Sequence, residues 1–172
     1  VRPTPLWFGS SARKQRSQPG LQKAPERRVF HSRFHCPPLA PARYVGGVAE
    51  VEIATPRGVR LKGTFVDPVD STDAAVVFSH ALLFDRTSTE HFDRLAAAYR
   101  SLGYATLVFD HSGHGLSDDD VITTDLRAQD LRAVSGWLEN KGFSRQLLHA
   151  HSSGTIAALA ARAPALRALL LT

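Results

Sequence analysis

The feature that most constrains the fold is a regular alternation of short apolar runs with longer segments of helical periodicity, from residue 74 onward. The runs at 74–79, 104–109, 146–150 and 166–171 show little apolar–polar alternation, as is typical of strands covered on both faces. Strands that alternate with helices in this way predict a mostly parallel sheet, with right-handed crossovers and helices on both faces. The sequence therefore predicts an α/β fold.

Three segments between these runs carry apolar residues at helical spacing. The first follows Thr87 and Glu90, which have capping-box spacing, and it ends at Gly103. The second spans about 124–140, and the third, which is rich in alanine, spans 153–162. We expect each helix to pack an apolar stripe against the sheet.

Before residue 74 the pattern changes to one that favours antiparallel pairing. Over residues 48–53, apolar positions alternate with Glu50 and Glu52, and a similar alternation runs over 59–66. The turn signal Pro56-Arg57-Gly58 separates the two segments. The sequence thus predicts an amino-terminal antiparallel hairpin ahead of the parallel strands.

Residues 1–44 differ in composition from the rest of the chain. They hold nine of the 21 lysines and arginines against a single acidic residue, so the formal net charge of +5 arises there. They show no sustained period and contain seven of the ten prolines, so we expect a disordered basic tail ahead of a folded domain over 45–172. The aromatic residues of the tail are not regularly interleaved with the basic ones, which disfavours nucleic-acid binding.

Other features bound the cellular setting and the cofactors. No apolar run approaches the ~18 residues of a membrane span, and the amino terminus has no apolar signal core. Cys36 is the only cysteine, which excludes an internal disulfide. These features favour a soluble cytoplasmic protein whose oligomeric state stays open. His31, His35 and Cys36 are too few for a convincing metal site, so we expect no metal and no cofactor.

The strongest chemical signal is the segment Ala150-His151-Ser152-Ser153-Gly154, which lies between an apolar run and an alanine-rich helical segment. A nucleophile elbow requires this strand–turn–helix setting, with small residues two positions before and two after the nucleophile. Ala150 and Gly154 meet that requirement, which selects Ser152 as the nucleophile. The alternative is a serine-rich turn that only caps a helix.

Two further motifs follow predicted strands. They are Phe78-Ser79-His80-Ala81-Leu82 and Asp110-His111-Ser112-Gly113-His114-Gly115-Leu116-Ser117. With the elbow, they occur in the order seen in the α/β-hydrolase superfamily, and the chain from about 48 to 172 resembles its serine-aminopeptidase-like (S33) bacterial hydrolases. The resemblance implies a serine hydrolase that acts on a small-molecule ester, thioester or amide through an acyl-enzyme on Ser152.

The resemblance also implies roles for neighbouring residues. The backbone N–H groups of Ser153 and Leu82 would form the oxyanion hole. Ala81 stands where the family usually has glycine, which makes the Leu82 half of the hole less regular. His80 would fix the loop, and His151 would support the turn with its side chain directed away from the nucleophile.

No position in the chain matches the family's catalytic acid or its histidine. A serine hydroxyl needs a base, and the base needs an orienting carboxylate. In this fold both follow later strands, so we expect an N-terminal fragment of an α/β-hydrolase, truncated after about the sixth strand and inactive by itself. The alternative is a catalytically dead α/β-hydrolase-like binding module.

Overall fold

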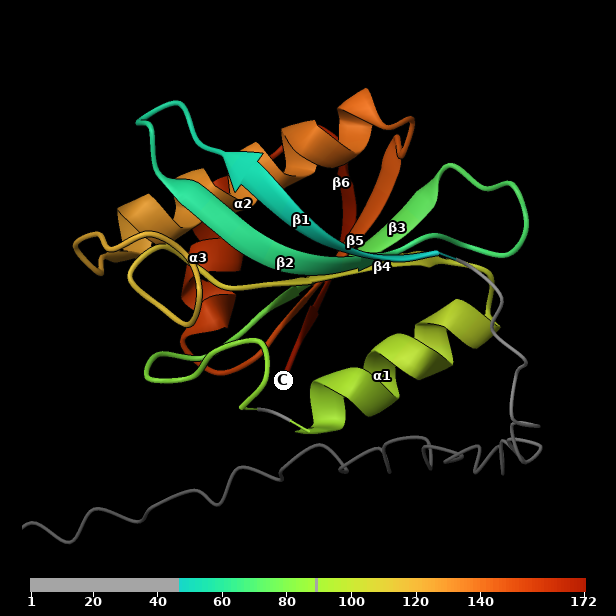
Figure 1. Cartoon of the computed structure of the whole chain (residues 1–172), viewed down its shortest axis with the longest axis horizontal. Coiled ribbons are helices and arrows are strands. Elements are labelled where there is room, and N and C mark those ends of the chain that lie inside the picture. Colours follow the sequence, from blue (N-terminus) through green and yellow to red (C-terminus); the bar gives the residue numbers. More distant parts are fainter. Residues whose placement is uncertain (1–46, 89) are drawn as a thin grey trace, which may run out of the picture. The chain divides into compact units, whose positions relative to one another are not determined.

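The computed structural model describes residues 47–88 and 90–172, and the predicted tail at 1–44 lies outside them. Within the described residues, six strands form one sheet in the order β1-β2-β4-β3-β5-β6 (Figure 1). The strands are β1 Val48–Ala54, β2 Arg60–Val66, β3 Ala74–Ser79, β4 Ala105–Phe109, β5 Arg145–Ala150 and β6 Leu166–Leu171. The helices are α1 Glu90–Ser101, α2 Thr124–Asn140 and α3 Gly154–Ala161.

The pairing of the strands divides the sheet into two parts. β1 pairs with β2 in antiparallel orientation, and β2 pairs with β4 in the same way. The β3–β4, β3–β5 and β5–β6 pairs are all parallel. The predicted hairpin and the predicted parallel strands are both confirmed. Because β4, β3 and β5 are neighbours that run parallel, their carboxyl ends meet at one edge of the sheet.

The helices cover both faces of the sheet, as the alternation predicted (Figure 1). On one face, Phe92 of α1 packs on Phe78 of β3, with their ring centroids 5.3 Å apart. On the other face, α2 and α3 pack against each other and bury Leu131 and Ala158 in the main core. Consecutive residues of β3 point to opposite faces, so an unbroken apolar run is what its position requires.

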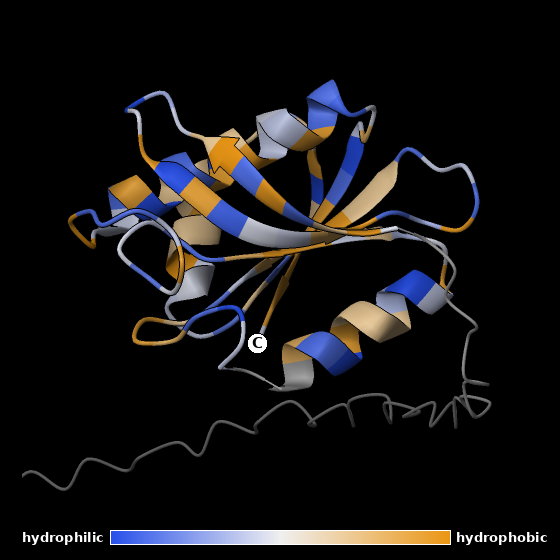
Figure 2. Ribbon diagram, in the orientation of Figure 1, coloured by the Kyte–Doolittle hydropathy of each residue, from blue (hydrophilic) through white to orange (hydrophobic). Residues whose placement is uncertain are grey.

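The hairpin strands have the opposite character. β1 and β2 alternate between hydrophilic and hydrophobic residues along their length (Figure 2). Leu61 and Phe65 are buried, whereas Lys62 and Thr64 reach Glu52 and Glu50 through side-chain hydrogen bonds. One face of the hairpin therefore joins the core while the other carries polar pairs.

The start of α1 differs from the prediction. The hydroxyl of Thr87 donates to the Asp85 carboxylate at 2.7 Å, and the helix begins only at Glu90. The predicted capping of α1 by Thr87 is therefore wrong, because the Thr87 hydroxyl is bonded to Asp85 in a local turn. α2 begins as predicted, with the Thr123 hydroxyl accepting the Leu126 N–H at 3.2 Å.

Candidate active site at the turn after β5

Ser152 lies at the bend between β5 and α3. It is exposed, and its φ of 51° falls in the left-handed region, which is uncommon for a residue with a side chain. Its N–H donates to the Thr172 carbonyl at 2.8 Å, which helps to hold the bend. The structure thus places the predicted nucleophile on a strained turn at the carboxyl edge of the sheet.

Small residues allow the bend to form. Ala150 is completely buried at the end of β5. A Cβ added to Gly154 would lie 2.6 Å from the Ser79 carbonyl oxygen and 2.7 Å from that of His80. Only glycine lets the first turn of α3 approach β3 so closely. Close packing therefore explains why both motif positions, 150 and 154, hold small residues.

Leu82 and Ser153, whose N–H groups are the predicted oxyanion donors, lie next to each other, and the Ser153 hydroxyl lies between them as a further polar group. The Leu82 N–H lies beside Ser153, but it donates to the Ser153 hydroxyl at 2.6 Å. Ser153 is the N-cap of α3, yet its side chain bonds no N–H of the helix. Its own N–H donates to none of the described residues. A carbonyl oxygen bound beside Ser152 would therefore meet the Ser153 N–H and the Ser153 hydroxyl.

Arg127 of α2 reaches the same place, although no sequence motif points to it. Its side chain is buried, and its Nη2 donates to the His80 carbonyl while its Nη1 donates to the Ser153 hydroxyl at 3.2 Å. Burial lowers the pKa of this guanidinium, although arginine stays charged at neutral pH. The available signal was an arginine four residues before the core residue Leu131, on the apolar stripe of a predicted helix.

His80 is held by both ring nitrogens. Its Nδ1 lies 2.8 Å from the Ala81 carbonyl, and its Nε2 accepts the His111 N–H at 3.0 Å. These partners assign the neutral tautomer with the proton on Nδ1. Burial, first of all, and the neighbouring His111 lower the pKa of His80 to about 3. Neither nitrogen is available to take a proton from Ser152.

Ser79, His111 and Asp130 are joined in series by hydrogen bonds. His111 Nε2 lies 2.9 Å from the Ser79 hydroxyl, and His111 Nδ1 lies 3.2 Å from the Asp130 carboxylate. This order of contacts matches a hydrolytic triad. All three side chains are completely buried, however, so no substrate reaches Ser79. This series of hydrogen bonds therefore links β3 to α2 and is not an active site.

Asp130 is the centre of that network, and no sequence motif points to this residue either. Its carboxylate also accepts hydrogen bonds from Arg57 at 2.5 Å and from the N–H and hydroxyl of Ser112. Burial raises the pKa of Asp130, but the bonds from His111 and Arg57 outweigh it, and the pKa lies below its ordinary value. Burial lowers the pKa of His111 to about 4, so its contact with Asp130 at neutral pH is a hydrogen bond and not an ion pair.

Asp110 connects the loops after β3 and β4. Its carboxylate accepts the Arg86 N–H at 2.7 Å and the Leu116 N–H at 3.1 Å. A Cβ on Gly115 would lie 2.5 Å from that carboxylate, and Gly115 has a φ of 53°, so this position requires glycine. Asp110 thus ties the glycine-rich loop after β4 to the loop after β3.

The other histidines near the site also contact other groups. His114 Nδ1 lies 2.9 Å from the Ser112 carbonyl, and His151 Nδ1 lies 3.3 Å from the Thr172 hydroxyl. None of the hydrogen bonds described above for His80, His111, His114 and His151 reaches the Ser152 hydroxyl. In the part of the chain that the structure describes, no three His, Cys, Asp or Glu side chains converge as metal ligands. Over the same residues, no helix has the length and apolarity to cross a bilayer.

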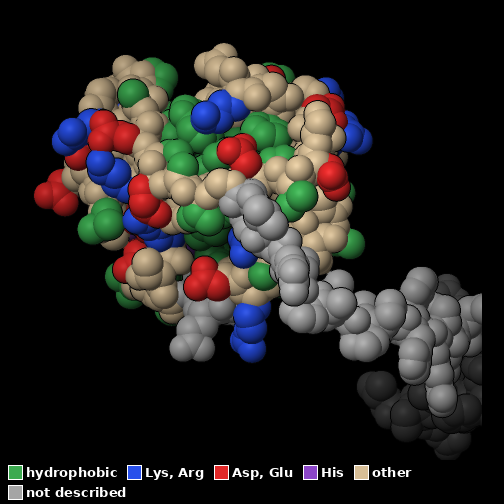
Figure 3. All heavy atoms as spheres, turned by 45° about the vertical axis from the view of Figure 1, so that its right-hand side comes forward, with side chains coloured by type: hydrophobic (Ala, Val, Ile, Leu, Met, Phe, Trp, Pro, Cys, Tyr) green, Lys and Arg blue, Asp and Glu red, His purple; other side chains and the backbone are tan. Residues whose placement is uncertain are grey.

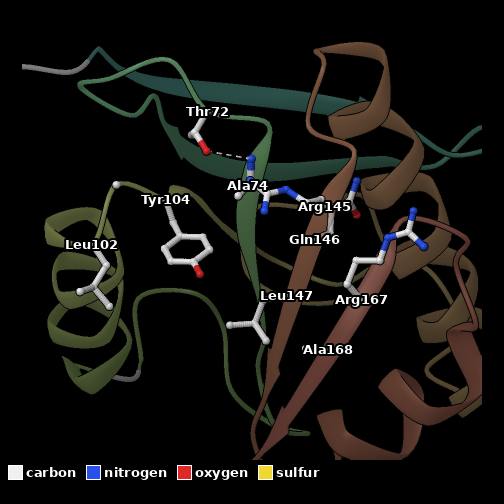
Figure 4. A pocket seen from close by; sticks show the side chains of 10 residues that line it. Thr72, Ala74, Leu102, Tyr104, Arg145, Gln146, Leu147, Arg167 and Ala168 are labelled. Atoms are coloured by element: carbon white, nitrogen blue, oxygen red, sulfur yellow. Dashed lines mark hydrogen bonds between the residues drawn. The ribbon is translucent and has the colours of Figure 1, made fainter.

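A cavity of about 380 Å³ lies elsewhere, at the amino ends of β3 and β5 (Figure 4). Tyr104, Arg145 and Arg167 are among its lining residues. Figure 3 shows one face of the molecule, on which apolar side chains gather among charged ones. Because Ser152 follows the carboxyl end of β5, this cavity is at the opposite end of the strand and does not serve the candidate nucleophile.

No protein-family model matches the chain, and no curated protein matches it either. Solved structures do match. The chain is 25% identical to the Pyrococcus furiosus esterase Pf2001, with a TM-score of 0.61 over 70% of this chain and 48% of that one. It is 20% identical to the α/β-hydrolase GrgF from a Penicillium species, with a TM-score of 0.66 over 73% and 45% of the two chains.

A third match is an esterase from Exiguobacterium antarcticum, 18% identical, with a TM-score of 0.61 over 72% of this chain and 45% of that one. The chain thus spans about half the length of the solved structures it matches. The sheet order, the helices on both faces and these likenesses together show that the chain has the α/β-hydrolase fold.

Proposed function

We propose that this chain carries the nucleophile of a serine hydrolase that acts on a small-molecule ester, thioester or amide. The observation that carries the proposal is the exposed Ser152 at a bend with positive φ, directly before the amino terminus of α3. Two matched structures are esterases, which supports an ester as the substrate class. The order of the three sequence motifs supports a likeness to the serine-aminopeptidase-like hydrolases.

The reaction would proceed by acyl transfer. Ser152 Oγ attacks the substrate carbonyl carbon, the carbonyl π pair moves to oxygen, and the hydroxyl proton passes to a general base. The oxyanion collapses, the bond to the leaving group breaks, and the protonated base returns its proton to the departing alcohol, thiol or amine. Water then repeats the sequence on the acyl-enzyme and releases a carboxylic acid.

The general base in this proposal is an imidazole from outside the described residues. His80 and His111 are neutral, buried and bonded at both ring nitrogens. A base and its orienting carboxylate would come from the part of an α/β-hydrolase that this chain does not span. We therefore expect hydrolysis from the full-length protein and negligible turnover from residues 1–172 alone.

A serine-directed fluorophosphonate probe tests the proposal in the full-length protein that carries this chain. We expect labelling of the wild type at Ser152 and loss of both labelling and p-nitrophenyl butyrate hydrolysis in Ser152→Ala. Removing the nucleophile of a triad costs about 10⁶-fold in kcat. Ser101→Ala, on α1 with its hydroxyl bonded to the Ala98 carbonyl, is the matched control and should label as the wild type does.

Labelling that persists in Ser152→Ala would refute this assignment. An unlabelled, inactive wild-type protein that is folded would instead favour the catalytically inactive binding module.

A further inference from the structure

The contact between Leu82, Ser153 and Arg127 is not explained by the proposed mechanism alone. The family resemblance gives the second oxyanion donor as the Leu82 N–H, but the Ser153 hydroxyl already occupies that N–H at 2.6 Å. Ser153 directly follows the proposed nucleophile. Its hydroxyl therefore accepts the hydrogen bond that the resemblance assigns to the oxyanion.

The hydrogen-bonding capacity of the Ser153 hydroxyl shows what it can still do. A hydroxyl oxygen accepts two hydrogen bonds and donates one. Both acceptor positions are filled, by the Leu82 N–H at 2.6 Å and by Arg127 Nη1 at 3.2 Å. Among residues 47–88 and 90–172, no group accepts its proton. The one remaining bond is a donated bond, and Ser153 is only partly buried, so it can reach a bound substrate.

The charge behind the hydroxyl is unusual. Arg127 is only 4% exposed, its Nε has no hydrogen-bond partner, and no described carboxylate forms an ion pair with it. The nearby Asp130 is already bonded to Arg57 and His111. Asp130 attracts the Arg127 charge without pairing with it directly, and a buried charge that lacks a direct ion pair is costly. Negative charge that develops on the substrate carbonyl oxygen would lower that cost during the reaction.

We propose that the Ser153 side-chain hydroxyl, and not the Leu82 N–H, donates the second hydrogen bond to the oxyanion, and that Arg127 positions and polarises this hydroxyl. This inference rests on the proposed function of Ser152. The Leu82 N–H then has a supporting role, because it holds the Ser153 oxygen in place. Ala81, in the position where the family usually has glycine, is tolerated because the loop N–H no longer has to face the substrate.

Ser153→Ala in the full-length protein is the first test. Loss of one oxyanion donor lowers kcat by about 100- to 1000-fold, and KM for p-nitrophenyl butyrate should change little because the donor acts in the transition state. Ser153→Thr keeps a hydroxyl and should recover much of the rate. Thermal unfolding of each variant checks that the fold is intact.

Two results for Ser153→Ala would overturn the inference. An unchanged kcat would show that the hydroxyl makes no contact with the oxyanion. A higher kcat would show that the hydroxyl blocks the Leu82 N–H in the wild type. Either result, together with complete loss of activity in Ser152→Ala, would leave the proposed function intact. Activity that survives Ser152→Ala would refute the proposed function itself.

The second test asks whether Arg127 acts through Ser153. Arg127→Gln should lower kcat by about tenfold, because a charge-assisted contact becomes a neutral one. Arg127→Lys, which keeps the charge, should recover part of that loss. In the background of Ser153→Ala, Arg127→Gln should cost little more, since residues that act as a unit are not additive.

Equal effects of Arg127→Gln in both backgrounds would rule out its action through the Ser153 hydroxyl. Arg132→Gln is the matched control, because Arg132 lies on the same helix and its guanidinium bonds the carbonyls of Ala160 and Ala161, away from the site. Its kcat should equal that of the wild type.

Discussion

At the scale of single residues, the site depends on how closely two backbones approach. The bend at Ser152 requires α3 to start against the end of β3, and Gly154 is the point of contact. The strain at Ser152 persists because Ala150 is fully buried on one side and the helix packs tightly on the other. Side-chain volume at these small residues thus controls the position of the nucleophile.

Gly154→Ala should destabilise the protein and impair the site. The added methyl group would lie 2.6 Å from a backbone oxygen that cannot rotate away, so α3 must shift. We expect a loss of about 1–3 kcal/mol in the free energy of unfolding, measured by urea denaturation, together with loss of probe labelling at Ser152.

Gly136→Ala is the matched control for this substitution. Gly136 lies within α2, and no atom would be within 4 Å of an added Cβ. Alanine should therefore stabilise the helix by up to about 1 kcal/mol. If both substitutions changed the stability by the same amount, the steric account of Gly154 would be wrong.

At the scale of elements, β6 stands out as an apolar edge strand. Within the described residues it pairs only with β5, and Leu169, Leu170 and Leu171 are 41–43% exposed. An exposed apolar edge can pair with another chain, so we expect β6 to be a site of aggregation in the isolated chain of residues 1–172.

Replacing Leu169 and Leu171 by lysine should reduce aggregation of the chain of residues 1–172. Charge on an edge strand opposes pairing with a second copy. We expect lower light scattering at equal concentration. The control replaces Leu102 and Leu159 by lysine, which adds the same charge. Both leucines are exposed but do not lie on the edge strand. Equal improvement in both variants would assign the effect to net charge and not to the edge.

At the scale of the whole molecule, buried polar groups join elements that are far apart in sequence. The His111–Asp130 contact connects the glycine-rich loop to α2, and Arg57 brings the turn between β1 and β2 to the same carboxylate. His80 and His111 are neutral in this network, with pKa values of about 3 and about 4. The stability of the whole fold is therefore coupled to pH.

The free energy of unfolding should fall as the pH is lowered from about 6.5 to about 4. In this range the unfolded chain protonates its histidines near their ordinary pKa of about 6.5, whereas His80 and His111 stay neutral in the folded state. Each of these two histidines lowers the free energy of unfolding by up to ~1.4 kcal/mol per pH unit in this range. The low pKa of Asp130 acts in the same direction in still more acid solution, where protonation removes its contribution.

His111→Gln provides the check, with urea denaturation at several pH values as the measurement. The glutamine can still bond Ser79 and Asp130 but does not titrate, so the slope of stability against pH should be smaller. A slope equal to that of the wild type between pH 6.5 and 4.5 would show that His111 does not carry this dependence.

The sequence by itself determined the elements and the position of the bend. β3, α2 and β6 have the expected bounds, and Ser152 lies at the expected turn, because period, capping and small residues act over short windows of chain. The start of α1 was placed incorrectly, since Asp85 competes for the Thr87 hydroxyl and that competition leaves no periodic signal.

Only the tertiary structure decided which polar groups meet. It inserted β4 between β2 and β3, buried Arg127 and Asp130 on the inner face of α2, and brought the Ser153 hydroxyl to the Leu82 N–H across 71 residues of sequence. These contacts follow from close packing between distant segments, where a buried polar group is stable only when it finds a partner. Periodicity reports which face of an element is apolar, but it does not report which atoms of another element that face will touch.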